Sequence, residues 1–223
     1  MHALAQQIKN GAVLPRQYNT VIYVGHSQGS LIGKAYIDQH PSDVSAVMLT
    51  GWTASEPLSA VSAELILPGL ATAASVHQRF HDLAPGYLTG VNASARAPFY
   101  SNQGKDYNPA ILTYDFATED VVTIGTLFTE TSLNQTIKSG FIGPVFVLTG
   151  QLDRIFCGSS GNCQGANGSV LAQQAQYFPS ASNYSYFSPA NTGHDWNLHY
   201  TQDVSFGRAF DWLADVGFGP SGH

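Results

Sequence analysis

The sequence GHSQG at residues 25–29 constrains the fold of this chain more than any other segment. It follows a β-branched and aromatic run at residues 20–24, which is typical of a buried strand, and it precedes residues 30–39, whose apolar spacing predicts a helix. Between a strand and a helix, a G-x-S-x-G pattern indicates a sharp turn that exposes the serine hydroxyl. The segment therefore predicts a nucleophilic Ser27; a Gly-rich turn with an incidental serine is the alternative.

The residues around Ser27 are expected to serve this turn. At so sharp a turn the residues on either side of the serine approach each other, so we expect that only glycine at Gly25 and Gly29 avoids a side-chain clash. The turn would also direct the backbone N–H of Gln28 towards the negative charge that develops on a substrate carbonyl oxygen. Gln28 is therefore predicted as an oxyanion donor. The side chain of His26 is expected to pack under the turn without taking part in the reaction.

The pattern of strands and helices predicts an α/β fold with a parallel sheet. Strands are predicted at residues 20–24, 44–50, 144–149 and 184–187. Helices are predicted at residues 1–11, 30–39, 169–178 and 201–216. In the last helix, the residues expected to be buried are Val204, Ala209, Phe210, Trp212 and Leu213.

The alternation stops between residues 52 and 140, where we predict an inserted helical cap. Residues 58–80 and 113–133 have a helical tendency, and residues 83–111 look irregular because they are rich in Pro, Gly, Tyr and Asn. The predicted organisation is therefore a core segment at 1–51 with the serine turn, a cap at 52–140, and a second core segment at 141–223 with acidic and histidine loops.

A serine nucleophile needs a base and an acid that orients the base. Asp153 follows the third predicted strand, and His194 follows the fourth, so both belong to the same sheet edge as Ser27. Ser, Asp and His in this chain order, each after a strand, are the order expected of such a site. The competing residues are His199 for the base, and Glu56 and the weaker Asp195 for the acid.

Two further groups of side chains have the chemistry of a disulfide or of metal ligands. Cys157 and Cys163 are separated by a Gly-rich spacer, so a disulfide within one loop is feasible; half a zinc site and two free thiols are the alternatives. His77, His81 and Asp82 resemble a metal-binding trio at helical spacing, but a third strong ligand is missing. We therefore predict no metal and no cofactor.

The composition excludes several classes of protein. A hydrophobic content of 43% can fill a core, and no apolar run approaches the ~18 residues that a membrane helix needs. The net charge of −6, without a basic tract, makes nucleic acid a poor partner. Glycosylation sequons begin at Asn92, Asn134, Asn167 and Asn183. With the cysteine pair they suggest a secretory, extracellular protein, although residues 1–11 lack a signal peptide, so we expect the chain to begin inside a larger protein.

Three segments resemble the α/β-hydrolase superfamily, in particular the secreted serine-hydrolase-like proteins of filamentous fungi. They are the GHSQGS elbow at 25–30, the T-G-x-x-D segment with paired cysteines at 149–163, and N-T-G-H-D-x-N-L-H at 191–199; the likeness covers residues 20–213. The resemblance implies a triad of Ser27, His194 and Asp153 that hydrolyses carboxylic esters or related acyl compounds. We expect a small apolar acyl or ester substrate, and the resemblance implies no particular compound.

The chain departs from this family before the elbow. A full α/β-hydrolase has about four strands before the elbow strand, with a loop that supplies a second oxyanion N–H, whereas only 26 residues precede Ser27 here. We therefore expect about four parallel strands, with the elbow strand at an open edge. Losing one oxyanion donor would reduce the rate by about 10²–10³. An impaired or inactive hydrolase-like fragment, and an acyltransferase or peptidase using the same triad, are the alternatives to an esterase.

Overall fold

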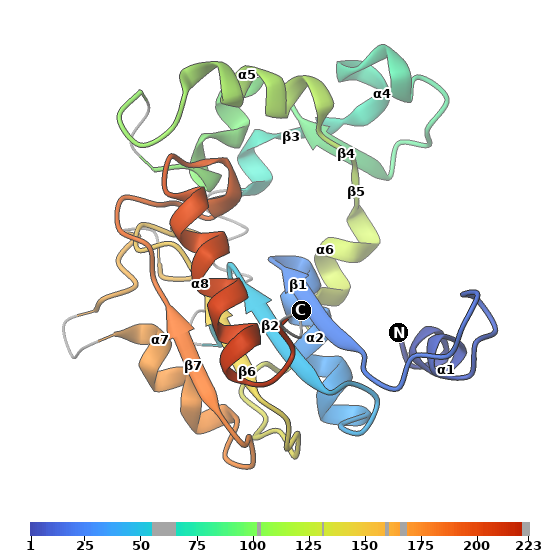
Figure 1. Ribbon diagram of the computed structural model, residues 1–223. Coiled ribbons are helices and arrows are strands. Elements are labelled where there is room, and N and C mark those ends of the chain that lie inside the picture. Colours follow the sequence, from blue (N-terminus) through green and yellow to red (C-terminus); the bar gives the residue numbers. More distant parts are fainter. Residues whose placement is uncertain (55–65, 102–103, 131, 159–160, 166–168, 220–223) are drawn as a thin grey trace.

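A computed structural model describes residues 1–54, 66–101, 104–130, 132–158, 161–165 and 169–219. Its main sheet has four parallel strands in the order β1 (Ile22–His26), β2 (Ala46–Thr50), β6 (Val145–Leu148) and β7 (Tyr184–Phe187) (Figure 1). This confirms the predicted α/β class and the four parallel strands, with β1 at one edge of the sheet.

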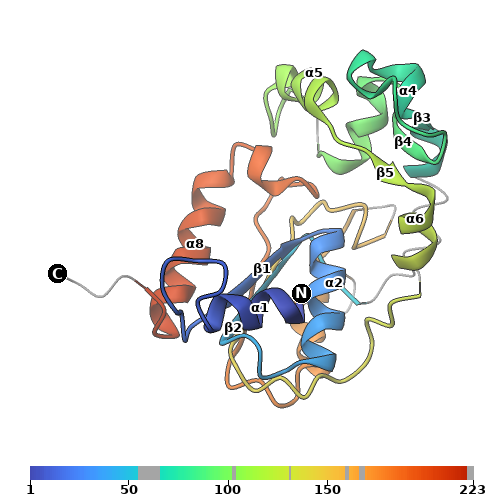
Figure 2. The ribbon, with the colours of Figure 1, turned by 90° about the vertical axis from the view of Figure 1, so that its right-hand side faces the viewer.

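Helices cover both faces of the sheet, which gives three layers (Figure 2). Helices α1 (His2–Lys9), α2 (Gln28–Gln39) and α7 (Val170–Gln173) share one hydrophobic core with one face, and α8 (Gln202–Asp215) packs on the other. The predicted helix at 169–178 is α7 followed by a 3₁₀ turn, η5 (Gln174–Tyr177). None of the helices in the described part of the chain combines the length and apolar character that a membrane span requires.

The two central strands are buried on both faces because their side chains alternate between the two cores. Val47 and Leu49 of β2 point into the core with α2, whereas Met48 points into the core with α8. Every residue of β2 and of β6 is buried, and this explains why both strands read as continuous apolar runs in the sequence.

The outer side of β1 is more exposed. Val24 of β1 is 61% exposed, and within the described residues β1 pairs with β2 alone.

The burial prediction for α8 was partly wrong: Ala209 and Trp212 are buried, but Val204 and Phe210 are 59% and 66% exposed. The helix turns Ala209 and Trp212 towards the sheet, with Leu213 partly buried against the same core, whereas Val204 and Phe210 face outwards.

A cap, which we define as residues 66–130, lies over the carboxyl ends of the parallel strands (Figure 1). It contains short helices, which only partly overlap the predicted helical stretches at 58–80 and 113–133, and a small antiparallel sheet in the order β3-β4-β5. Its helices are α4 (Ala73–Val76), α5 (Pro109–Thr118) and α6 (Ile124–Glu130), and its strands are β3 (Leu70–Thr72), β4 (Tyr87–Gly90) and β5 (Val122–Thr123). Short 3₁₀ segments are η2 (Leu67–Gly69), η3 (Gln78–Phe80) and η4 (Ala93–Phe99), with η6 (Trp196–Leu198) before α8. Most of the predicted helix at 58–80 lies outside the described residues or is not helical.

Candidate active site

Ser27 lies at the junction of β1 and α2 with a strained backbone. Its φ of 54° and ψ of −119° place it in a region that non-glycine residues avoid at a cost of about 1–3 kcal/mol. The turn is held by its neighbours, because the Ser27 N–H donates to the Thr50 carbonyl (2.9 Å) and the Ser30 hydroxyl donates to the Gly25 carbonyl (2.8 Å). Such strain at a strand-to-helix turn is the geometry of an exposed nucleophile.

The steric requirement for glycine falls on Gly25 alone. A Cβ at Gly25 would lie 2.5 Å from the Gly29 carbonyl oxygen and 2.8 Å from the Ser30 nitrogen. A Cβ at Gly29 would meet nothing within 4 Å outside the backbone of its own helix. The expectation for Gly29 was therefore wrong: its carbonyl, and not its Cα, is the atom that approaches Gly25.

Gln28 connects the serine turn to the cap. It is the first residue of α2, so its backbone N–H has no acceptor within the helix and lies at the positive end of the helix dipole. Its side-chain Nε2 donates to the Glu130 carboxylate of α6 (2.8 Å). Burial raises the pKa of Glu130, and the hydrogen bond from Gln28 opposes that rise. The position of Gln28 suits it to hold a negative oxygen.

Asp153 is completely buried in the loop after β6, and both of its oxygens are engaged. Oδ1 accepts from the backbone N–H groups of Ile155 (2.8 Å) and Phe156 (2.9 Å), whereas Oδ2 faces Nδ1 of His194 at 2.8 Å. The next turn is closed by a disulfide between Cys157 and Cys163, as predicted. The carboxylate therefore has a fixed direction.

His194 is only 1% exposed and presents one unpartnered nitrogen. Its Nδ1 is held by Asp153, and its Nε2 has no hydrogen-bond partner in the part of the chain that the structure describes. Burial favours the neutral ring, but the Asp153 carboxylate and its hydrogen bond outweigh this effect, so the pKa of His194 lies above its usual value. A ring held in this way can accept a proton at Nε2.

The competing His199 has a structural role instead. It is also 1% exposed, but its Nε2 accepts from the backbone N–H groups of Gly193 (3.1 Å) and Ser101 (3.2 Å), and its Nδ1 donates to the Asp195 carbonyl (2.9 Å). Burial lowers the pKa of His199, which favours the neutral ring that these bonds require. This arrangement ties the cap to the His194 loop.

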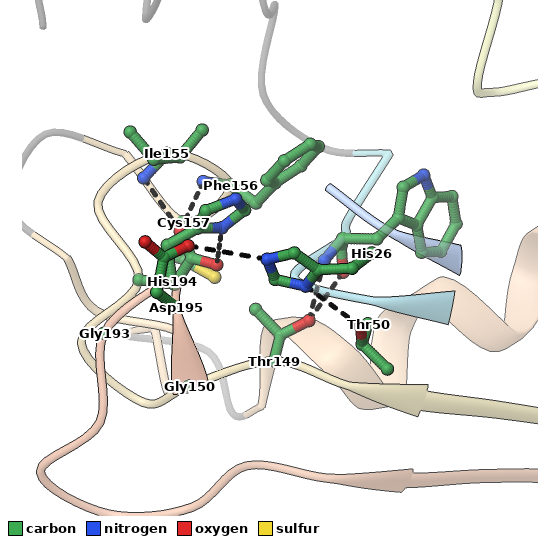
Figure 3. Close-up of polar contacts among 12 residues, drawn as sticks. His26, Thr50, Thr149, Gly150, Ile155, Phe156, Cys157, Gly193, His194 and Asp195 are labelled. Carbon is green, nitrogen blue, oxygen red and sulfur yellow. Dashed lines mark hydrogen bonds and ion pairs between the residues drawn. The ribbon is translucent and has the colours of Figure 1, made fainter. Parts of the chain in front are cut away.

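Asp195 and His26 form a second pair beside His194 (Figure 3). The Oδ1 atom of Asp195 lies 3.6 Å from Nε2 of His26, and its Oδ2 lies 3.5 Å from the guanidinium of Arg96 in the cap. Asp195 therefore does not orient His194. The expectation that His26 packs under the turn was wrong. Its ring lies against the His194 ring, with centroids 4.8 Å apart, and its Nδ1 forms a hydrogen bond with the Thr50 hydroxyl (3.0 Å).

Glu56, the other competing acid, lies outside the described residues. His77 contacts Glu119 of the cap at 3.2 Å, while His81 contacts Asp82 at 3.1 Å. Within the described ranges, His77, His81 and Asp82 do not form one of the clusters that could hold a metal ion.

A pocket of about 350 Å³ opens beside Ser27, between the main sheet and the cap. Its apolar wall includes Leu31, Ile66, Leu70, Phe99, Val122, Ile155 and Phe156. Its charged wall comes from the cap and consists of Arg96, Asp115, Glu119, Asp120 and Glu130. Sequence reasoning missed Arg96 and Glu130, because an isolated charge in an irregular segment carries no signal of what it will contact.

Comparison with known proteins identifies the architecture. No family model matches the chain, and no curated protein matches it. Among solved structures, it resembles a protein described as non-heme bromoperoxidase BpoC from Mycobacterium tuberculosis (17% identity, TM-score 0.57, covering 96% of this chain and 72% of the other). It also resembles a monoacylglycerol lipase from Paleococcus ferrophilus (14%, TM-score 0.55, covering 89% and 69%) and an esterase from Thermogutta terrifontis (14%, TM-score 0.51, covering 88% and 65%). The chain therefore has the fold of the α/β-hydrolases.

Proposed function

We propose that this chain is a serine hydrolase that cleaves carboxylic esters or related acyl compounds. The observation that carries the proposal is the orientation of His194: Asp153 holds Nδ1, and Nε2 makes no hydrogen bond to Ser27 or to any other described residue, so the proposed proton transfer requires the Ser27 hydroxyl to approach Nε2. A nucleophile-type turn at Ser27 ends a strand of the same sheet. A base oriented by a buried acid is what a serine needs to become a nucleophile.

The proposed reaction has two halves. The Ser27 hydroxyl attacks the acyl carbon while His194 Nε2 takes its proton, and Asp153 stabilises the imidazolium that forms. The oxyanion is held by the Gln28 N–H, and its collapse expels the alcohol, which takes the proton from His194. In the second half, His194 removes a proton from water, the hydroxide attacks the acyl-enzyme, and Ser27 regains its proton as the carboxylic acid leaves.

The pocket supports a small ester as the substrate. Its apolar wall suits an acyl chain. Ester-cleaving enzymes are also named among the structures of the same fold, although one fold hosts many chemistries.

A catalytically impaired hydrolase is the second candidate, and one observation favours it. The elbow strand β1 pairs only with β2 in the described part of the chain, so the position of Ser27 is supported from one side. An acyltransferase and a peptidase are further alternatives. Both would use the same residues, and their products would differ from those of ester hydrolysis.

We further propose that the protein works in an oxidising, secretory compartment and carries glycans. The disulfide supports this setting, and Asn92, Asn134 and Asn183 are exposed, whereas Asn167 lies outside the described residues. Mass spectrometry of protein from a secretory host, before and after glycosidase treatment, tests the assignment. Unmodified asparagines at all four sites would contradict it.

The test of the activity is a panel of p-nitrophenyl esters with acyl chains of increasing length, assayed with wild type and Ser27→Ala. Hydrolysis by wild type with an acyl-enzyme burst, lost in Ser27→Ala, is the expected result. Adding alcohol and amine acceptors distinguishes hydrolysis from acyl transfer by the products. Equal hydrolysis by Ser27→Ala would refute the serine mechanism, and a folded but inactive wild type would favour the impaired hydrolase.

A further inference from the structure

Three potential metal ligands gather beside the base. One ligand atom each from His26, His194 and Asp195 lies within 4.8 Å of the others. His26 ends β1, and the other two belong to the loop after β7, so the cluster joins the two sides of the site (Figure 3). Gly51, with φ of +54°, makes room for it, because a Cβ there would lie 2.8 Å from the Cε1 atoms of both rings.

The spacing of His26 and Asp195, and the hydrogen bonds of the two histidines, are compatible with a zinc site. Nε2 of His26 and Oδ1 of Asp195 are 3.6 Å apart, which is close to the separation of two ligands around Zn²⁺ with bonds of about 2.0–2.2 Å. Histidines that bind a metal usually use their other nitrogen in a hydrogen bond. Here Nδ1 of His26 bonds Thr50, and Nδ1 of His194 bonds Asp153.

The free nitrogen of His194 is the observation that points to a ligand. Its Nε2 is buried and has no hydrogen-bond partner among the described residues, which is costly for a polar atom unless something binds it. His26, whose side chain is 38% exposed, leaves a route for an ion from solvent.

Arg96 does not prevent a cation from binding. Its guanidinium approaches Oδ2 of Asp195 and leaves Oδ1 facing His26. The charge of Arg96 is also balanced by two other carboxylates, Asp115 at 2.8 Å and Glu119 at 3.9 Å.

A second cluster, formed by His2, His40 and Asp43, provides a contrast. Both oxygens of Asp43 already accept hydrogen bonds: Oδ1 from Gln6 (2.8 Å), and Oδ2 from Tyr36 (2.9 Å) with His2 at 2.6 Å. A metal ion would have to break these contacts. The cluster therefore serves as a control and not as a candidate site.

We propose that His26, His194 and Asp195 bind a divalent transition-metal ion, with Zn²⁺ as the best match, and that the bound ion inhibits the hydrolase. The ion would occupy Nε2 of His194, the atom that must take the proton from Ser27. The inhibitory part rests on the proposed function, whereas metal binding does not.

Binding is tested first, by calorimetric titration of the chelator-treated chain with Zn²⁺ and by absorption spectra with Co²⁺. We compare wild type, His26→Ala and His40→Ala, the last of which removes a ligand from the other cluster. The expected result is one ion per chain, with affinity at least about tenfold weaker in His26→Ala and unchanged in His40→Ala. No binding, or binding lost only in His40→Ala, would overturn the proposal.

Inhibition is then tested with a fluorophosphonate probe that labels Ser27. Zn²⁺ should slow labelling of wild type and His40→Ala, a chelator should restore it, and His26→Ala should need at least about tenfold more Zn²⁺, relative to its own metal-free rate. Bound Zn²⁺ that leaves labelling unchanged would refute the contact with His194. Absence of labelling without metal would instead refute the proposed function, and the titration would still decide whether the metal site exists.

Discussion

The two sides of the candidate site differ in the burial of their residues and in the number of contacts that hold them. Asp153 and His194 follow β6 and β7, are at most 1% exposed, and are held by hydrogen bonds that fix both side chains. Ser27 ends the edge strand β1, where Val24 is 61% exposed and only β2 supports the strand. The proposed acid and base are therefore held by hydrogen bonds within a buried environment, whereas the proposed nucleophile depends on one strand and one helix. We expect variants on the two sides to fail in different ways.

The largest effect on activity is expected for His194→Ala, and the equally buried His199 provides the comparison. His194→Ala should reduce kcat/KM by about 10⁴, because the base is lost. His199→Ala should instead lower the free energy of unfolding by about 2 kcal/mol or more, because the N–H groups of Gly193 and Ser101 lose their acceptor. Steady-state kinetics and urea unfolding measure the two effects. A greater loss of activity in folded His199→Ala than in His194→Ala would contradict the assignment of the base.

A smaller effect is expected at the serine turn. Gly25→Ala places a Cβ 2.5 Å from the Gly29 carbonyl oxygen, so the turn must shift and the Gln28 donor moves with it. Displacing an oxyanion donor costs about 10²–10³ in kcat. Gly29→Ala is the matched control, because its Cβ meets open space. Equal kcat values for the two variants would show that the turn is not held by the close approach at Gly25.

The pH profile tests the electrostatics of the acid–base side. His194 must be neutral to accept a proton, and its pKa is raised above the usual 6.5, so log kcat/KM should fall as the pH drops through a midpoint above 6.5. Asp195 contributes to this rise less than Asp153 does. Asp195→Asn should therefore move the midpoint to lower pH. The exposed Asp203→Asn is the control, and an unchanged midpoint in Asp195→Asn would exclude this influence.

The smallest effect on activity is expected from the disulfide. Replacing Cys157 and Cys163 together by alanine should lower the free energy of unfolding by about 2 kcal/mol, because the bridge closes a short loop. The Asp153 carboxylate is held by Ile155 and Phe156, which precede the bridge, so kcat/KM should stay within about tenfold. Thermal unfolding and ester hydrolysis measure both. A loss of activity without a loss of stability would show that the bridge positions the acid.

Features that depend on local sequence patterns could be predicted, whereas features that depend on contacts distant in sequence could not. The strands, and the positions of Ser27, Asp153 and His194 at one sheet edge, follow from local patterns of apolar residues, Gly and Pro. The cap sheet was not predicted, because strands as short as β5, with two residues, are joined by contacts distant in sequence. The structural role of His199 and the pairing of His26 with Asp195 depend on contacts between loops, which no local pattern encodes.

Covalent labelling tests most directly whether Ser27 is an activated nucleophile. The purified chain and Ser27→Ala are treated with a fluorophosphonate probe, and the adduct is located by mass spectrometry. We predict one adduct on Ser27 of the wild type and none in the folded variant. A folded wild type that takes up no probe, or a Ser27→Ala variant labelled to the same extent, would contradict it.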